Sequence, residues 1–201
     1  MAITLAITGA SGAAYGLRLL EQLILAKQIV YLLVSAPAQI VIDMETDLKL
    51  PSHPRAIQIY LSERYHAAPE QLHVFGREEW TAPVASGSAA PQAMVICPCT
   101  NGTLAALANG LSRSLIERAA DVILKEQRKL ILVHRETPLS IIQLENMLRL
   151  AKSGALILPA NPGFYHRPEK VNDIVDFIVA RVLDHLGISH CLLQPWGMSA
   201  G

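Results

Sequence analysis

Several residue types that could do chemistry stand where apolar, β-branched runs of this sequence end. Hydroxyls, glycine turns, an arginine and a glutamate occur at residues 9–12, 35, 97–103, 134–136 and 159–166. In a sheet of parallel strands the carboxyl ends meet along one edge, and ligands bind there. These positions therefore predict one binding site, assembled from separate stretches of the chain.

The first stretch, "TGASG" at residues 8–12, lies between an apolar run and a helical pattern. Backbone N–H groups at a helix N-terminus favour anions, so the loop predicts a phosphate site. The dinucleotide fingerprint has a glycine where Ser11 stands, and its spacing differs from that of Gly9, Gly12 and Gly16. Ser11 would hinder a pyrophosphate but offers a hydroxyl to a single phosphate or a ribityl chain. The loop favours a mononucleotide such as FMN over NAD, and an ordinary tight turn is the alternative.

Two further stretches offer polar groups at strand ends. Residues 100–103 stand between a predicted strand and a helix, where they could wrap a ligand with main-chain donors or simply cap the helix. Arg135 and Glu136 are neighbours at another strand end. Successive side chains on an extended chain point to opposite sides, so one could face a cofactor and the other a substrate. A surface ion pair is the alternative for them.

The C-terminal part of the chain holds an aromatic hydroxyl and an isolated cation. Tyr165 follows a loop rich in proline and glycine, which suits either a rigid substrate lid or a plain surface loop. Arg181 interrupts the apolar stripe of a predicted helix, and a buried arginine there would need an anion. Pairing with Asp176 or Asp184 is the alternative.

Three other side chains could take part in a site. Trp80 follows two glutamates in a predicted loop and is either a packing anchor or an aromatic wall. Arg118 and Lys125 stand two helical turns apart, so they share one face of a predicted helix. The residues between them on the chain include small and apolar ones that suit packing against another helix.

The elements that must position these residues alternate along the chain as strand and helix. Such alternation predicts an α/β fold: a single doubly wound, mainly parallel sheet with helices on both faces. Ser140 is a good N-cap for one of the helices. We expect one domain over residues 1–201, whose last residues from about 195 form a tail. The predicted strands are 3–8, 29–35, 72–75, 93–99, 129–136 and 155–159, and the predicted helices are 15–27, 37–45, 55–65, 103–109, 115–126, 141–152 and 169–186.

The composition excludes several function classes. Lys plus Arg equals Asp plus Glu, at 17 each, so no overall charge would attract nucleic acid. Only 17% of the residues are charged and 51% are hydrophobic, which predicts that subunit contacts cover part of the surface. Cys97 and Cys99 are too close to pair comfortably and Cys191 stands apart, so we expect neither a disulfide nor a metal site. No apolar stretch reaches about 20 residues, and we expect a cytoplasmic protein without a signal peptide.

Taken together, these stretches resemble the UbiX-like flavin prenyltransferases, within the wider Rossmann-like group of flavin-binding, cysteine decarboxylase-like proteins. The resemblance covers residues 8–188, nearly the whole chain, in the right order. The sequence departs from the family pattern at His134, where a proline is usual, and at Thr100 and Asn101, which replace a more usual serine-containing pair. The matching pieces are "TGASGAAYG", "ASGSAAP", "MVICPCTNGTLAALANG", "LIERAADVILKE", "RETPLS", "LENMLRLAKSGALILPANPGFYHRP" and "DFIVARVLDHLGI".

The resemblance implies an enzyme that needs no metal and makes no net redox change. It would join a dimethylallyl group from dimethylallyl phosphate to N5 and C6 of reduced FMN. The prenylated FMN would then serve a UbiD-type decarboxylase, as in ubiquinone biosynthesis. Carried over by position, Ser11, Glu136 and Lys125 would be catalytic. The residues that would hold FMN are Gly9, Ala10, Ser11, Ser35, Thr100, Asn101, Gly102, Thr103 and Arg135.

The resemblance also implies a site for the prenyl phosphate and an assembly. The residues that would bind this substrate are Tyr165, Arg181, Arg118, Lys125 and Trp80. We expect a homo-oligomer, a dodecamer, in which Arg118 and Lys125 act on a neighbouring subunit's site. Two alternatives keep the fold: an FMN-dependent cysteine-type decarboxylase, and a non-catalytic FMN carrier for a decarboxylase. The decarboxylases use a histidine near the flavin and different clamp motifs, and a carrier would need only the flavin loops.

Overall fold

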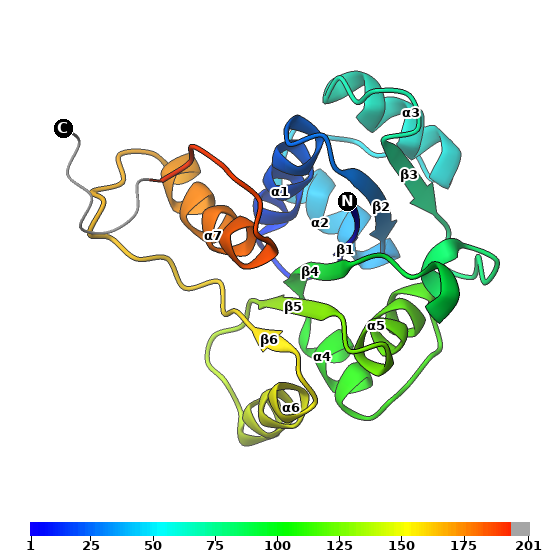
Figure 1. Cartoon of the computed structure of the whole chain (residues 1–201). Helices are drawn as coiled ribbons and strands as arrows, with labels where there is room; N and C mark the ends of the chain where they lie inside the picture. The colour runs from blue at the N-terminus through cyan, green and yellow to red at the C-terminus, as the bar shows by residue number, and fades with distance from the viewer. Residues whose placement is uncertain (194–201) are drawn as a thin grey trace.

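In the computed structural model, which describes residues 1–193, the strands form one parallel sheet in the order β3-β2-β1-β4-β5-β6 (Figure 1). The order reverses between β1 and β4, as in doubly wound folds, so the predicted fold class is confirmed. The tail expected from about residue 195 lies outside the described residues. The strands are β1 (Ala2–Ile7), β2 (Ile29–Val34), β3 (Leu72–Phe75), β4 (Ala93–Cys99), β5 (Lys129–His134) and β6 (Leu156–Ile157).

The strands are apolar nearly throughout because helices cover both faces of the sheet. Strand β4, for example, is buried at every position. Two apolar clusters, one on each face, make up the core. One face carries α1 (Ala13–Leu25), α3 (Pro54–Arg64) and α7 (Val171–Leu186), and the other carries α4 (Asn101–Ala108), α5 (Leu115–Lys125) and α6 (Ile141–Lys152).

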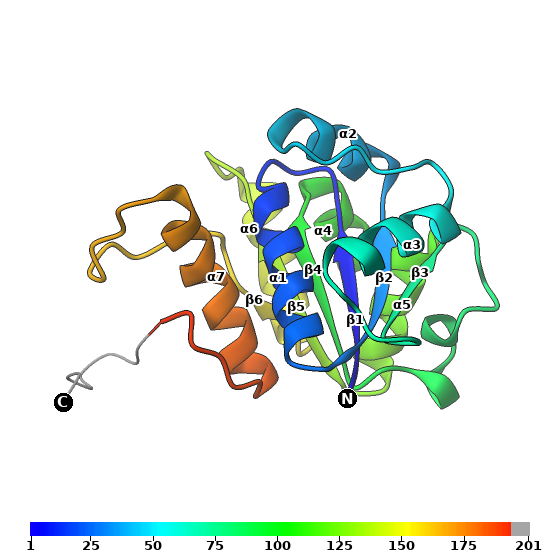
Figure 2. The same ribbon diagram turned by 90° about the horizontal axis from the view of Figure 1, so that it is seen from above.

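Helix α2 (Ala36–Glu45) lies across the carboxyl ends of the strands instead of along a face (Figure 2). Two short 3-10 turns, η1 (Pro83–Ala85) and η2 (Gly87–Ala89), connect β3 to β4, and η1 packs against α5. After β6 the chain runs out from the body of the domain and returns as α7 (Figures 1 and 2). The carboxyl edge of the sheet is thus framed by α2 and by the loops that follow the strands.

The predicted elements all occur, with bounds that shift by a few residues. Helix α4 begins two residues earlier than expected, because Thr100 caps it by accepting a hydrogen bond from the Thr103 N–H at 3.1 Å. Helix α7 begins two residues later, where the Asp173 carboxylate accepts the Lys170 N–H at 3.0 Å. The predicted cap at Ser140 is confirmed, since Ser140 forms a capping box with Gln143.

Candidate active site

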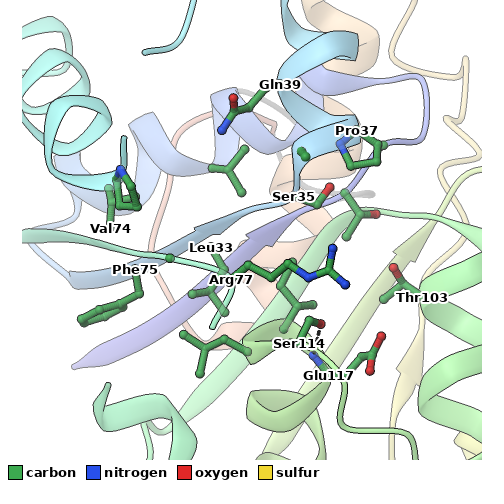
Figure 3. A pocket seen from close by; sticks show the side chains of 18 of the residues that line it. Leu33, Ser35, Pro37, Gln39, Val74, Phe75, Arg77, Thr103, Ser114 and Glu117 are labelled. Atoms are coloured by element: carbon green, nitrogen blue, oxygen red, sulfur yellow. Dashed lines mark hydrogen bonds between the residues drawn. The ribbon is translucent and has the colours of Figure 1, made fainter. Parts of the chain in front are cut away.

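A cavity of about 560 Å³ opens at the carboxyl ends of β1, β2 and β3, between α2 and the starts of α4 and α5 (Figure 3). Apolar side chains from the strands and hydroxyl, amide and charged groups from the surrounding loops share its wall. A cavity of this size with a few polar groups is typical of a small-molecule site. Five of the residues expected to hold FMN line it: Gly9, Ser35, Thr100, Gly102 and Thr103.

Helix N-termini face this cavity and make it suitable for a negatively charged ligand. Ser35 caps α2 by accepting a hydrogen bond from the Ala38 N–H at 3.2 Å, as Thr100 caps α4. The Thr100 N–H donates to the hydroxyl of buried Thr8 at 3.0 Å, which ties the end of β4 to the end of β1. Helix N-termini attract anions through their N–H groups and dipoles, so the cavity fits a phosphate-bearing ligand.

Two glycines keep the backbone close to its neighbours and to the cavity. A Cβ added at Gly9 would lie 2.4 Å from the Cβ of Pro37, so any side chain there would push α2 away. A Cβ added at Gly102 would have Thr100 Oγ1, at 4.0 Å, as its nearest neighbour. Because Gly102 lines the cavity, its bare backbone leaves room for a ligand to approach closely.

Glu45, at the end of α2, contacts the first loop and was not anticipated from the sequence. Its Oε2 accepts hydrogen bonds from the N–H groups of Gly12 and Ala13 at 2.8 and 2.9 Å. Burial alone would raise the pKa of Glu45, but the Ser11 hydroxyl, the two N–H groups and nearby Arg135 together lower it. The donors expected to face a phosphate thus hold an ionised carboxylate of the protein itself. The Ser11 hydroxyl hydrogen-bonds to this carboxylate, and Ala10 is buried.

Arg135 and Glu136 follow the end of β5 and bind different neighbours. The Arg135 guanidinium donates to the Ser11 carbonyl oxygen at 3.1 Å. The Glu136 carboxylate accepts a hydrogen bond from the Asn101 side-chain amide at the start of α4. The two charged groups also approach one another, at 3.9 Å. Glu136 is partly exposed, so one part of it remains accessible to a ligand.

The cavity has further polar residues that sequence reasoning missed. Arg77 extends its guanidinium group into the space between Ser35 and Thr103 (Figure 3). Gln39 and Glu117 line the same cavity. Arg77 could have been found, because it follows the predicted strand at 72–75 and so stands at the carboxyl edge. Gln39 and Glu117 are helix residues, and nothing in their spacing distinguishes them from surface positions.

Tyr165 and Arg181 lie away from this cavity. Tyr165 lines a smaller pocket of about 350 Å³ before α7, and its ring packs edge-to-face on Phe177 at 5.8 Å. The expectation that Arg181 is buried is wrong for the single chain. Its side chain is 49% exposed and forms an ion pair with Asp184 at 2.7 Å, because the two residues share the outer face of α7. Asp176, the other candidate partner, instead binds Arg18.

Arg118 and Lys125 both turn toward the segment that holds η1 and η2. The Arg118 guanidinium donates to the Ala85 carbonyl oxygen at 3.0 Å, and the Lys125 ammonium group pairs with Glu126 at 2.5 Å. Helix α5 starts at the cavity and runs away from it, so Lys125 lies about 12 Å along the helix axis from Glu117. Trp80 is 47% exposed in the loop after β3. One chain therefore does not bring the expected prenyl-phosphate residues together.

The cysteines of β4 are unsuited to nucleophilic chemistry. Cys97 and Cys99 are fully buried, and burial raises the pKa of both thiols, that of Cys99 to about 12. Within residues 1–193, no group of three or more His, Cys, Asp or Glu side chains is placed to hold a metal ion. None of the helices described over the same residues is long and apolar enough to cross a membrane.

Known proteins match this chain over nearly its whole length. The Flavoprotein family matches residues 1–183. The flavin prenyltransferase UbiX of Pseudomonas aeruginosa is 58% identical over 195 residues, 97% of this chain and 93% of that protein. A UbiX crystal structure in complex with FMN and dimethylallyl pyrophosphate is 37% identical with a TM-score of 0.87, covering 98% of each chain. A dodecameric FMN-dependent UbiX-like decarboxylase from Escherichia coli O157:H7 is 39% identical with a TM-score of 0.86, covering 98% of this chain and 100% of that one.

Proposed function

This chain belongs to the family of UbiX-like flavin prenyltransferases, and from that premise we propose the reaction that it carries out. It joins a dimethylallyl group from dimethylallyl phosphate to N5 and C6 of reduced FMN. The product, prenylated FMN, passes to a separate UbiD-type decarboxylase in the cytoplasm. The observation that supports this reaction most is the cavity where the starts of α2 and α4 face one space.

The residues of the cavity fit FMN. Hydroxyl and N–H donors stand at two helix N-termini, which suit the phosphate and the ribityl hydroxyls, and Gly102 allows close approach of the ligand. When bound, reduced FMN supplies the nucleophile that takes the dimethylallyl group. We assign the holding of FMN to the cavity residues Gly9, Ser35, Thr100, Gly102 and Thr103, with Arg77 as an added cation. We also assign it to Ala10, Ser11, Asn101 and Arg135, which do not line the cavity of the single chain.

A hydroxyl and a carboxylate at this edge are suited to handling protons. The Ser11 hydroxyl hydrogen-bonds to Glu45, whose lowered pKa keeps it ionised as a hydrogen-bond acceptor. With its hydrogen directed to Glu45, Ser11 Oγ would accept a hydrogen bond from the group of the reduced flavin that loses a proton. Glu136, partly exposed and anchored by Asn101, would take the proton that the reduced flavin loses and give it to the departing phosphate.

The cation-rich part of the site comes from neighbouring subunits. Lys125 and Arg118 lie on a half-exposed face of α5, and Arg181 on an exposed face of α7. Charged donors placed around a leaving phosphate stabilise the charge that develops on it, most strongly where water is excluded. In a homo-oligomer of twelve subunits, these residues, with Tyr165 and Trp80, complete the prenyl-phosphate site of an adjacent chain. The similarity to a dodecameric protein supports this assembly.

Anaerobic incubation with reduced FMN and dimethylallyl phosphate tests the reaction, with mass spectrometry of the extracted flavin as the readout. The flavin should gain one dimethylallyl unit, and flavin of unchanged mass would refute the proposal. Loss of carbon dioxide from a cysteine-containing substrate would instead indicate a decarboxylase, and FMN binding with neither reaction would indicate a carrier. Adding the product to an inactive UbiD-type apoenzyme tests the recipient, which should become active.

A further inference from the structure

A chain of hydrogen bonds runs from the end of β5 to Glu136. His134, the last residue of β5, is 2% exposed, and its Nε2 lies 2.7 Å from Oδ1 of Asn101. Asn101, the first residue of α4, donates through its Nδ2 to Oε2 of Glu136. The chain thus connects a buried ring, an amide and a partly exposed carboxylate on two different elements.

The chemistry of the three groups fixes where the protons lie. The Asn101 amide nitrogen faces Oε2 of Glu136, which accepts its hydrogen bond. The Asn101 carbonyl oxygen then faces His134, which must donate from Nε2. Burial lowers the pKa of His134, Glu136 raises it and Arg135 lowers it, and the net shift is downward. At neutral pH the ring is therefore uncharged, with its hydrogen on Nε2.

Glu136 depends on this chain for its orientation. Its other oxygen, Oε1, accepts the N–H of Thr137, the next residue, at 3.0 Å. That bond joins Glu136 only to the backbone of the next residue and does not fix the carboxylate relative to α4. The hydrogen bond from α4 to Glu136 comes from the Asn101 side chain. His134 holds the Asn101 amide with its nitrogen toward Glu136. The Asn101 side chain is not needed to cap α4, because Thr100 already caps this helix.

We propose that His134 and Asn101 are positioning residues for Glu136, which hold its carboxylate in the orientation that proton transfer requires. This inference rests on the proposed function, in which Glu136 moves a proton. His134 acts through Asn101, and Asn101 acts on Glu136 directly. A misplaced catalytic group can lose about a hundredfold in rate, so the pair would act mainly on kcat.

Matched variants of His134 separate positioning from packing. His134→Leu removes the donor, whereas His134→Gln keeps an N–H in a side chain of similar reach. We expect kcat to fall about ten- to a hundredfold in His134→Leu and in Asn101→Ala, and in His134→Leu we expect KM for both substrates to stay within about threefold of wild type. His134→Gln should recover most of the lost kcat. Equal losses in His134→Gln and His134→Leu, or wild-type kcat in His134→Leu, would overturn the proposal.

Infrared difference spectroscopy of the protein alone gives a readout that does not depend on the reaction. The carboxylate band of Glu136 is the one that Glu136→Gln removes. That band should shift in Asn101→Ala and His134→Leu and return in His134→Gln, whereas an unmoved band would contradict the proposed chain. If wild type forms no prenylated flavin, the proposed function fails while the infrared result still decides the positioning. FMN binding that weakens in His134→Leu as strongly as kcat falls would show that the chain of hydrogen bonds acts through the flavin and would also overturn the proposal.

Discussion

Subunit mixing tests whether the catalytic residues come from two chains. Lys125 lies about 12 Å along α5 from Glu117, the last residue of that helix at the cavity, and its ammonium group pairs with Glu126. Glu136 lies at the carboxyl edge of the same chain, held by Asn101. If both residues act in one reaction, Lys125 must reach the site of a neighbouring subunit.

The perturbation is a mixture of Lys125→Ala subunits with Glu136→Gln subunits, each inactive when alone. After random exchange at equal amounts, a complete site needs Glu136 from one parent and Lys125 from the other, so about one quarter of the wild-type sites should be restored. The assay is the rate of prenylated FMN formation, with subunit exchange verified by native mass spectrometry of isotope-labelled protein. Lys152→Ala, on exposed α6, is the matched control, and its mixture with Glu136→Gln should retain about one half of the activity.

Two results would refute the reasoning. Mixed assemblies that exchange fully yet recover no activity would show that Lys125 and Glu136 serve the same chain's site, where every site carries one defect. Full activity in a diluted, monomeric subunit would show that no neighbour is needed.

Three further predictions concern the carboxyl edge. Glu136→Gln should still bind FMN but lose about 10²–10⁴-fold in turnover, and a loss below about tenfold would remove Glu136 from the mechanism. Ser11→Gly should keep flavin and lose at least about tenfold in rate, and wild-type activity would reduce Ser11 to a turn residue. Glu45→Gln should lower the free energy of unfolding in urea by up to about 1 kcal/mol at pH 7, because an amide cannot replace the carboxylate at the start of α1. Because the folded-state pKa of Glu45 is lowered, the stability difference between wild type and Glu45→Gln is fully present above pH 4.5. The difference disappears as the pH falls through the folded-state pKa. A difference that persists in acid would contradict this prediction.

Local sequence signals were sufficient to predict the fold and several of the polar residues that line the cavity. Alternating apolar strands and capped helices determine a parallel sheet, and the sheet brings Gly9, Ser35 and Thr100 to one edge although they are far apart in sequence. The N-cap signal of Ser140 correctly placed the first residue of α6. Such features are predictable because each depends on neighbours within a few positions.

Other parts of the site depend on contacts that one sequence does not reveal. Glu45 is the last residue of a helix and reaches the first loop across 33 positions, so no spacing pattern marks it. Arg181 was expected to be buried because its helix is apolar, yet the helical period places it with Asp184 on the outer face. The proposed contacts of Lys125 and Tyr165 with other subunits lie beyond any single chain.

The contact between Glu45 and the first loop gives the protein a means of rejecting the wrong nucleotide. In a dinucleotide-binding protein, the N–H groups at the start of the first helix receive a pyrophosphate. Here the Gly12 and Ala13 N–H groups already hold a carboxylate of the chain. An incoming pyrophosphate would have to displace that carboxylate or lie beside it at like-charge repulsion. We therefore expect discrimination against NAD to be electrostatic as well as steric, with Glu45 acting from a helix that lies far from Gly12 in sequence.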